Sequence, residues 1–360
     1  MKILIVEDNE EYIENYKELI KNFNEKNPDS NIEVRWAADV KSGIESIREN
    51  KFDGAIIDLK IPSESGSDPH IQNTNGEKII EDISMERKFP VAVVSGYADS
   101  IDEKYIKKKG LFLKIYRRGD EDIGEILADF VLINKAGIAE VFGRGGKIEE
   151  FIDEIYYKNI QSAVRADKNI KEKGILRYFS IVLQEHLDIR SSGSFDEYSL
   201  FEFYIAPPVK EFHFTGEIIK KTEVGVDNKY VILTPACDMD TRGDSNCEIN
   251  NVVCVKIISG DDIIKIEDKT AKNRKNQNKY LDDDIKPNKN KRYHYLPEIS
   301  GIMDENSFID FRHIRTFDKL DDNIKSVATI SAPFLKDIIA RFSHYYSRQG
   351  QPELKIINQK

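Results

Sequence analysis

Five polar side chains in the first third of the sequence have types and positions suited to phosphoryl chemistry. Glu7 and Asp8 follow an apolar run at the start of the chain, and Asp58 follows another. Ser95 and Lys114 come near the ends of two later apolar runs. Converging carboxylates repel each other unless a cation lies among them, and hard oxygen ligands suit Mg²⁺. A carboxylate beside such an ion can accept a phosphoryl group, whose oxygens a hydroxyl and an ammonium group can bind.

These residues need a scaffold that gathers the ends of several strands. Short apolar runs predict five strands, Lys2–Val6, Glu33–Ala37, Gly54–Leu59, Val91–Ser95 and Leu111–Ile115. Helical patterns alternate with them, at Glu10–Asn24, Asp39–Glu49, Gly76–Glu86, Asp99–Lys108 and Asp120–Asn134. This alternation predicts a flavodoxin-like, doubly wound (βα)5 domain of the α/β class. In that fold ligands bind at the carboxyl ends of the strands, where the five polar residues lie.

The order and types of these residues resemble the receiver domain of two-component response regulators, over residues 1–134. Asp58, in the segment Phe52-Asp53-Gly54-Ala55-Ile56-Ile57-Asp58-Leu59-Lys60-Ile61-Pro62, resembles the phospho-acceptor. Ser95, in Val93-Val94-Ser95-Gly96, resembles the switch hydroxyl, and Lys114 resembles the lysine of that family. The resemblance implies that Asp8, Asp58 and the backbone carbonyl of Lys60 ligate Mg²⁺, with Glu7 acting through water. It also implies a sensor histidine kinase as the partner that donates the phosphoryl group.

Three features depart from the family's pattern. The glycine that usually follows the acceptor loop corresponds here to Gly76, so about ten residues are inserted within Ser63–Asn75. Ile115 follows Lys114, where the family usually has a proline. Leu111 stands at the position of the switch aromatic. These departures leave the acceptor chemistry in place but put the usual switch and output face in question.

The composition limits the class of protein. A chain of 360 residues predicts two or three domains, and its net charge of −10 disfavours binding to duplex DNA. No apolar run approaches the roughly 18 residues that span a bilayer, and the N-terminus lacks the pattern of a signal peptide. Three cysteines, Cys237, Cys247 and Cys254, are too few for a disulfide framework and match no zinc pattern. We therefore expect a cytoplasmic protein without a membrane segment.

The rest of the chain predicts a helical linker over residues 135–190 and an α+β, strand-rich output domain over 191–360. Helical patterns cover Lys147–Arg165, Ile170–Leu187 and Ala332–Arg348. The predicted strands are Leu200–Ile205, Phe212–Lys220, Lys229–Thr234 and Asn251–Ile258. Lys269–Lys291, rich in Lys, Asn and Asp, predicts a surface loop.

These features favour a response regulator that accepts a phosphoryl group on Asp58 and relays or buffers the signal through a region that does not bind nucleic acid. The sequence leaves undecided whether the protein acts on a downstream effector protein and whether it forms a homodimer. The alternative is a receiver-controlled effector enzyme, nuclease-like or another hydrolase, using Cys237, Asp238 or Arg348. The whole layout also weakly resembles receiver proteins of bacterial anti-phage two-component systems. Beyond phospho-acceptance and self-dephosphorylation at Asp58, no enzyme motif is evident.

Overall fold

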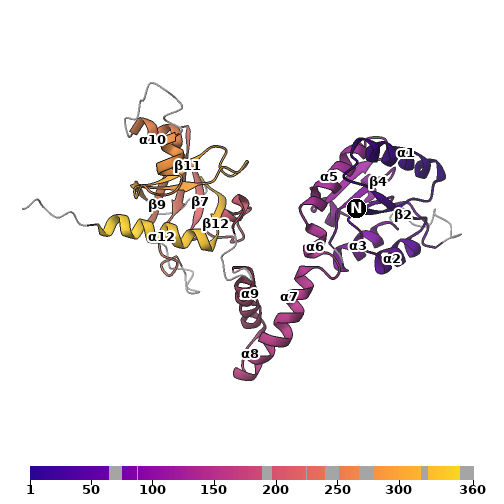
Figure 1. The fold of residues 1–360 in the computed structure, drawn as a ribbon, viewed down its shortest axis with the longest axis horizontal. Helices are drawn as coiled ribbons and strands as arrows, with labels where there is room; N and C mark the ends of the chain where they lie inside the picture. The colour runs from indigo at the N-terminus through magenta and orange to yellow at the C-terminus, as the bar shows by residue number, and fades with distance from the viewer. Residues whose placement is uncertain are drawn as a thin grey trace, which may run out of the picture. The chain divides into compact units, whose positions relative to one another are not determined.

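The computed structural model describes residues 1–64, 75–86, 88–188, 197–223, 225–239, 251–266, 279–317 and 323–348. The chain divides into two compact units, Met1–Phe195 and Asp196–Lys360 (Figure 1). Within the described residues, no helix has both the length and the apolar character needed to cross a membrane.

The first unit is built on a parallel sheet of five strands in the order β2-β1-β3-β4-β5. Its strands are β1 (Lys2–Val6), β2 (Glu33–Ala37), β3 (Gly54–Ile57), β4 (Val91–Ser95) and β5 (Leu113–Arg117). The predicted flavodoxin-like fold is therefore confirmed. The order places β1 and β3 side by side in the middle of the sheet, so the residues that follow these two strands meet at one edge.

Helices cover both faces of this sheet (Figure 1). They are α1 (Glu10–Lys26), α2 (Val40–Glu49), α3 (Glu77–Glu86), α4 (Glu103–Ile106) and α5 (Ile123–Lys135), with a 3₁₀ turn, η2 (Ala98–Ser100). Alternate residues of a strand face opposite sides. Accordingly Ile3 and Ile5 pack against α1 and α5, whereas Leu4 and Val6 pack against α2 and α3. Both faces of the central strands are apolar, so polar chemistry is confined to the strand ends.

Two sequence predictions in this unit need correction. The fifth strand runs from Leu113 to Arg117, two residues later than predicted, because Gly110 and Leu113 first close a small bridge and leave Leu111 and Phe112 exposed. The helix predicted over Asp99–Lys108 is replaced by the short η2 and α4, which Asp102 separates as the N-cap residue of α4. The shift of β5 changes which basic residue lies at the end of the sheet.

Further helices follow the five-stranded domain. They are α6 (Ile138–Phe142), α7 (Lys147–Ile155), a π-helical turn η3 (Tyr156–Ile160), α8 (Gln161–Ala166) and α9 (Glu172–Asp188). The segment around α6 reaches back to the first domain, where the Arg144 guanidinium donates to the Arg48 carbonyl oxygen. The helices predicted over Lys147–Arg165 and Ile170–Leu187 are present, the first with a π-helical turn in its middle.

The second unit contains an antiparallel sheet in the order β10-β11-β9-β8-β7-β12-β6. Its strands are β6 (Tyr204–Ile205), β7 (Glu217–Glu223), β8 (Val226–Ile232), β9 (Val252–Ser259), β10 (Tyr293–Leu296), β11 (Ser307–Phe317) and β12 (Ile324–Ile330). Its helical segments are η4 (Leu200–Phe203), α10 (Gly260–Ile266), η5 (Leu281–Ile285) and α12 (Ala332–Ser347). The predicted strand-rich α+β class is thus confirmed.

Two local predictions in this unit were wrong. The strand predicted over Leu200–Ile205 is mostly the 3₁₀ turn η4, which a capping box between Ser199 and Glu202 closes. The loop predicted over Lys269–Lys291 contains the π-helical turn η5 where its sequence is described, and its residues 269–278 lie outside the described ranges. By contrast, α12 matches the predicted C-terminal helix and buries Ile338 against the sheet.

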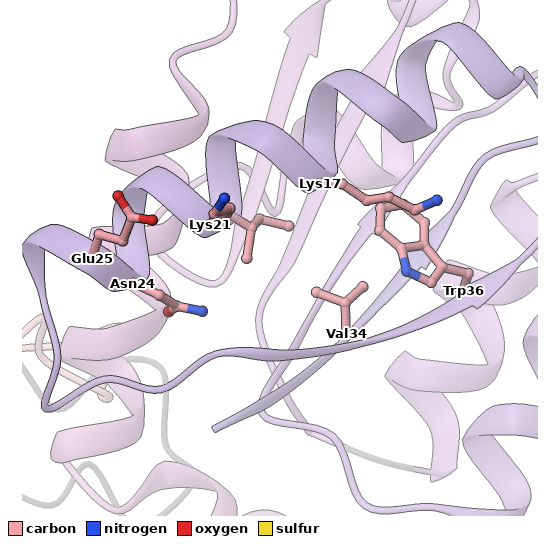
Figure 2. Close-up of a pocket in the computed structure, with 7 residues that line it drawn as sticks. Lys17, Lys21, Asn24, Glu25, Val34 and Trp36 are labelled. Atoms are coloured by element: carbon pink, nitrogen blue, oxygen red, sulfur yellow. The ribbon is translucent and has the colours of Figure 1, made fainter.

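The single tryptophan, Trp36, lies in the first unit and reports on its folding. It stands on β2 beside α1, in a hollow of about 480 Å³, where the Lys17 ammonium group lies 5.8 Å from the ring centre (Figure 2). Because no other tryptophan contributes, its fluorescence separates unfolding of this unit from unfolding of the other.

Replacing Gly76 by alanine should destabilise the first unit. A methyl group at Gly76 would clash with the Asp58 carbonyl oxygen and would lie 2.9 Å from Leu59 Cα, both of them backbone atoms held by the sheet. Overpacking of this kind costs about 1–3 kcal/mol. We expect the free energy of unfolding to fall by that amount in urea titrations followed by Trp36 fluorescence.

Gly96→Ala is the matched control, since a methyl group there meets no atom within 4 Å. An unchanged unfolding midpoint for Gly76→Ala would show that the segment after β3 does not pack as described.

Candidate functional site: an acidic cluster at the strand ends

Three carboxylates converge at the carboxyl edge of the parallel sheet. Glu7 and Asp8 directly follow β1, and Asp58 directly follows β3. One ligand oxygen from each lies within 4.8 Å of the others. Glu7 is 2% exposed and Asp58 is 9% exposed, whereas Asp8 is open to solvent. These three residues, called the acidic cluster below, are brought together as the sequence predicts.

The backbone fixes the two buried carboxylates. The Glu7 N–H donates to the Ala37 carbonyl (3.0 Å), and the Asp58 N–H donates to the Val6 carbonyl (3.0 Å), so both residues continue the strand ladders. The Lys60 N–H then donates to Asp58 Oδ1 at 3.1 Å. This bond orients the Asp58 carboxylate and leaves Oδ2 to face the rest of the cluster.

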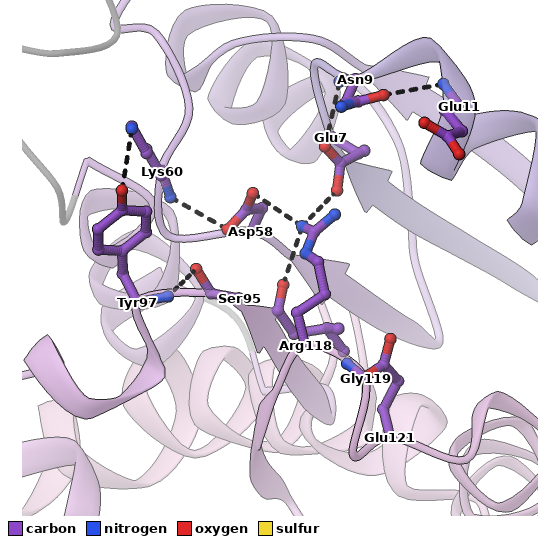
Figure 3. Close-up of polar contacts among 11 residues, drawn as sticks. Glu7, Asn9, Glu11, Asp58, Lys60, Ser95, Tyr97, Arg118, Gly119 and Glu121 are labelled. Carbon is purple, nitrogen blue, oxygen red and sulfur yellow. Dashed lines mark hydrogen bonds and ion pairs between the residues drawn. The ribbon is translucent and has the colours of Figure 1, made fainter.

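Arg118 is the cation of this site, and sequence reasoning did not identify it. Its Nη2 donates to Glu7 Oε2 (2.7 Å) and to Asp58 Oδ2 (2.8 Å), and it lies 3.3 Å from the Val94 carbonyl oxygen (Figure 3). The guanidinium carbon also lies 3.8 Å from the centre of the Tyr12 ring on α1. One nitrogen therefore joins the ends of β1 and β3 through their carboxylates.

A tight turn after β5 positions Arg118. The Asp120 N–H donates to the Arg117 carbonyl at 2.9 Å, which places Arg118 and Gly119 at the centre of a four-residue turn. Gly119 has φ +97°, the positive value that the third residue of a type II turn requires. The pair Gly119-Asp120 is a turn signal in the sequence, and it marks the true end of the strand one residue before Arg118.

Burial and charge act in opposite directions on this cluster. Burial raises the pKa of Glu7, and the neighbouring Arg118 guanidinium only partly offsets this rise. Loss of hydration likewise raises the pKa of Asp8, with a further contribution from the Asp58 charge. For Arg118, burial acts to lower the pKa, but the charges of Asp58 and Glu7 outweigh it and raise the pKa above its usual value. The three carboxylates outnumber the one guanidinium, so the cluster retains a strong preference for cations.

Lys114 is not part of the cluster, contrary to the sequence prediction. It is the second residue of β5 and pairs with Ala92, three positions before Ser95 in the neighbouring strand. Its Nζ forms ion pairs with Glu125, at 2.8 Å, and with Asp129, both on α5. The hydrogen bonds that Nζ donates to Asp129 and Glu125 raise the pKa of Lys114. The two-residue shift of β5 places Lys114 within the strand and leaves the end of the sheet to Arg117 and Arg118.

Ser95 and Lys60 lie near Asp58 (Figure 3). Ser95 is the last residue of β4 and is fully buried, and its Oγ accepts a hydrogen bond from the Tyr97 N–H at 3.2 Å. The Lys60 ammonium group lies 3.2 Å from the Tyr97 hydroxyl and 4.7 Å from the centre of that ring (Figure 3). Figure 3 thus shows the Ser95 hydroxyl near Asp58, whereas the Lys60 ammonium group is directed toward Tyr97.

The donors of the acidic cluster fit a hard divalent cation. Mg²⁺ prefers oxygen ligands and usually keeps several waters, so it is bound by one or two carboxylates rather than by a closed cage. Asp8 is exposed and Asp58 offers a carboxylate with one oxygen directed into the cluster, which meets these needs. The ion pairs of Arg118 with Asp58 Oδ2 and Glu7 Oε2 act against the binding of such an ion.

The candidates for a second site, in the other unit, are paired elsewhere or exposed. Cys237 is exposed, and its thiol donates to the adjacent Asp238 carboxylate at 3.3 Å. Three histidines of this unit that could act as bases for a nucleophile each contact a carboxylate, His213 with Glu217, His294 with Asp337 and His313 with Asp310. The Arg348 guanidinium lies 4.3 Å from the Tyr345 ring centre at the end of α12. Cys247 lies outside the described residues.

The hollows of the first unit include two that lie outside the acidic cluster. One is the groove at Trp36 already described. The other, of about 460 Å³, is mainly apolar and is lined by residues of α3, β5 and α6, including Ile83, Phe112, Ile138 and Phe142. Phe112 precedes β5, so this second hollow lies at the opposite end of the sheet from the acidic cluster.

Comparisons with known proteins find similarity to receiver domains in the first unit. No family model and no curated protein matches the sequence. A CheY-like receiver domain from Methylobacillus flagellatus is 18% identical and aligns over 38% of this chain and 97% of its own, with a TM-score of 0.27. One from Methanospirillum hungatei is 19% identical over 38% of this chain and 98% of its own, with a TM-score of 0.29.

A third solved structure is the receiver domain of a sensor histidine kinase from Pseudomonas aeruginosa, with a magnesium ion coordinated in its active-site cleft. It is 16% identical over 36% of this chain and 96% of its own, with a TM-score of 0.26. At these identities the likeness concerns the fold. The strand order of the first unit is by itself that of a flavodoxin-like fold.

Replacing Glu7 by glutamine should stabilise the first unit at neutral pH. Burial raises the pKa of Glu7 in the folded protein, so its ionised form costs stability once the pH exceeds the usual value of 4.5. The cost grows as the pH rises from 4.5 through the elevated pKa and is absent below that range. Urea unfolding followed by Trp36 fluorescence should show a gain at pH 7 that disappears near pH 4.

Glu45→Gln, at an exposed position on α2, should show no such pH-dependent gain. A Glu7→Gln variant less stable than the natural protein at pH 7 would mean that the ion pair with Arg118 outweighs the cost of burial.

Proposed function

We propose that the first unit is the phospho-acceptor receiver domain of a response regulator, and that Asp58 takes its phosphoryl group from a sensor histidine kinase. The observation that carries this proposal is the convergence of Glu7, Asp8 and Asp58 within 4.8 Å at the carboxyl edge of a parallel sheet. Ser95 at the end of the next strand adds a buried hydroxyl beside the acceptor. We also propose that the protein is cytoplasmic.

In the transfer step, a carboxylate oxygen of Asp58 attacks the phosphorus atom of the donor. The new bond joins this oxygen to phosphorus, and the bond between phosphorus and the donor histidine nitrogen breaks. That nitrogen leaves with the electron pair. The Lys60 N–H, 3.1 Å from Asp58 Oδ1, holds the nucleophile in place. The Ser95 hydroxyl, whose oxygen already accepts from Tyr97, has its own proton free to donate to a phosphoryl oxygen.

Asp8, Asp58 and the Lys60 carbonyl are the residues that would hold Mg²⁺, with Glu7 acting through water. When bound, the ion supplies positive charge that offsets the carboxylates and the incoming phosphoryl oxygens. Burial of Glu7 and Asp58 strengthens this attraction because the local dielectric is low. Hydrolysis of the resulting acyl phosphate by water would return Asp58 to its starting state.

For the rest of the chain we propose a relay or buffering role without binding to nucleic acid. The net charge of −10 opposes contacts to a phosphate backbone. The segment after residue 134 already contacts the receiver fold, because Ile138 and Phe142 on α6 line the apolar hollow with Phe112. This contact connects the helices beyond α5 to the phospho-acceptor domain. We propose that a downstream effector protein is the partner of these helices.

The proposal is tested by phosphorylating the full chain with acetyl phosphate and Mg²⁺. The intact mass should rise by about 80 Da, the mass of one phosphoryl group. Asp58→Asn should abolish the gain, because the amide is not a nucleophile for this reaction. Omission of Mg²⁺ or addition of EDTA should also prevent it.

Asp99→Asn is the matched control, since Asp99 is an exposed aspartate in η2, outside the acidic cluster, and should label like the natural protein. Absence of labelling in the natural protein, or equal labelling of Asp58→Asn, would reject the assignment of Asp58.

A further inference from the structure

The acidic cluster is occupied by a cation from the protein itself. Arg118 Nη2 reaches Glu7 Oε2 at 2.7 Å and Asp58 Oδ2 at 2.8 Å, the two oxygens that face each other across the cluster. Three negative carboxylates and one positive guanidinium leave two negative charges uncompensated. The site therefore still attracts a divalent cation but already contains a competitor for it.

A divalent cation and the guanidinium cannot hold these oxygens at the same time without cost. Mg²⁺ binds its oxygen ligands at about 2.1 Å. A guanidinium nitrogen at 2.8 Å from Asp58 Oδ2 would then lie within a few ångströms of the ion, where two positive charges repel strongly in a partly buried site. Binding of the ion to Asp58 must displace Arg118 or shift it.

The contacts of Arg118 suit a residue that can be displaced. Among the described residues its Nη1 is buried without a hydrogen-bond partner, so the guanidinium is held by one of its two terminal nitrogens. The Tyr12 ring at 3.8 Å supplies a second, non-directional contact outside the carboxylates. Lys114, by contrast, is held away from the cluster by Glu125 and Asp129 on α5 and cannot take the place of Arg118.

We propose that Arg118 is a built-in counter-ion that competes with a divalent cation for Glu7 and Asp58 and so sets the cation affinity of the receiver site. The inference rests on the proposed function, because it concerns the same cluster. It predicts that the natural protein binds divalent ions more weakly than the same protein without this charge. Phosphorylation of Asp58 then requires a divalent cation concentration high enough to displace Arg118.

The test is a calorimetric titration of the full chain with Mn²⁺ and, separately, with Mg²⁺. Arg118→Gln should bind both ions at least about tenfold more tightly than the natural protein, which corresponds to about 1.4 kcal/mol. Arg117→Gln is the matched control, because it removes the same charge from the adjacent, exposed position. The control should change the affinity little.

Two further variants separate competition from a folding defect. Arg118→Lys keeps the charge, so its affinity should stay near that of the natural protein. Tyr12→Leu keeps Arg118 but removes the ring that supports it, so its affinity should rise by less than that of Arg118→Gln. Trp36 fluorescence and circular dichroism of each variant check that the first unit is folded.

Equal or weaker binding by a folded Arg118→Gln variant, or an equal gain in Arg117→Gln, would overturn the inference. Phosphorylation is measured on the same samples with acetyl phosphate. Tighter binding by Arg118→Gln with no labelling of Asp58 in any protein supports the competition and rejects the proposed function. Labelling of Asp58 with identical cation affinities supports the function and rejects the competition.

Discussion

The structure of the first unit depends on the compensation of two carboxylates that are buried at the carboxyl edge of its sheet. Glu7 and Asp58 are 2% and 9% exposed, and carboxylates removed from water are costly unless hydrogen bonds and opposite charge compensate them. Arg118 supplies both to the two residues at once. The turn at Gly119 directs Arg118 toward these carboxylates, so the compensation of their charge depends on this turn.

The apolar core explains why this charge lies where it does. Ile3, Leu4, Ile5 and Val6 are all fully buried, because helices cover both faces of the sheet. A strand of this kind cannot carry a charged side chain along its length, so the first acidic residue appears where the ladder ends. The same ladder fixes the position of that residue, since the Glu7 N–H still bonds to the neighbouring strand.

The buried strands were predictable for the same reason, whereas the bounds of the fifth strand were not. Gly54–Ile57 and Val91–Ser95 are apolar on both faces, and a polar residue marks each end. At the edge of the sheet Leu111 and Phe112 are 46% and 53% exposed, although they look like the start of a strand. Because side chains alternate with a period of two, a two-residue shift keeps every face correct and moves only the strand end. The prediction therefore placed Lys114 at the end of the fifth strand and missed Arg118.

In the second unit, strands that pair with distant parts of the sequence could not be predicted from local patterns. The last part of β11 (Ser307–Phe317) contains exposed polar residues such as Arg315, and its partners on β9 lie about sixty positions earlier in the sequence. A bulge between Ile309 and Ile314 also interrupts its alternation. No local pattern reveals such a strand, because its stability comes from backbone bonds to distant residues. The helix α12 was found because its apolar side, with Ile338 at its centre, is a local periodic signal.

Under the proposed function, Arg118 and Lys60 indicate how phosphorylation of Asp58 would affect the rest of the domain. Arg118 lies against the Tyr12 ring on α1, and Lys60 lies against the Tyr97 ring after β4. A phosphoryl group adds about 1.5 to 2 negative charges at Asp58, more than either cation alone can offset. Under this proposal the phosphoryl oxygens compete with each ring for its cation, and the two rings belong to different segments of the domain. We therefore expect the change in charge at Asp58 to alter the packing at α1 and at the loop after β4, where Tyr12 and Tyr97 are exposed.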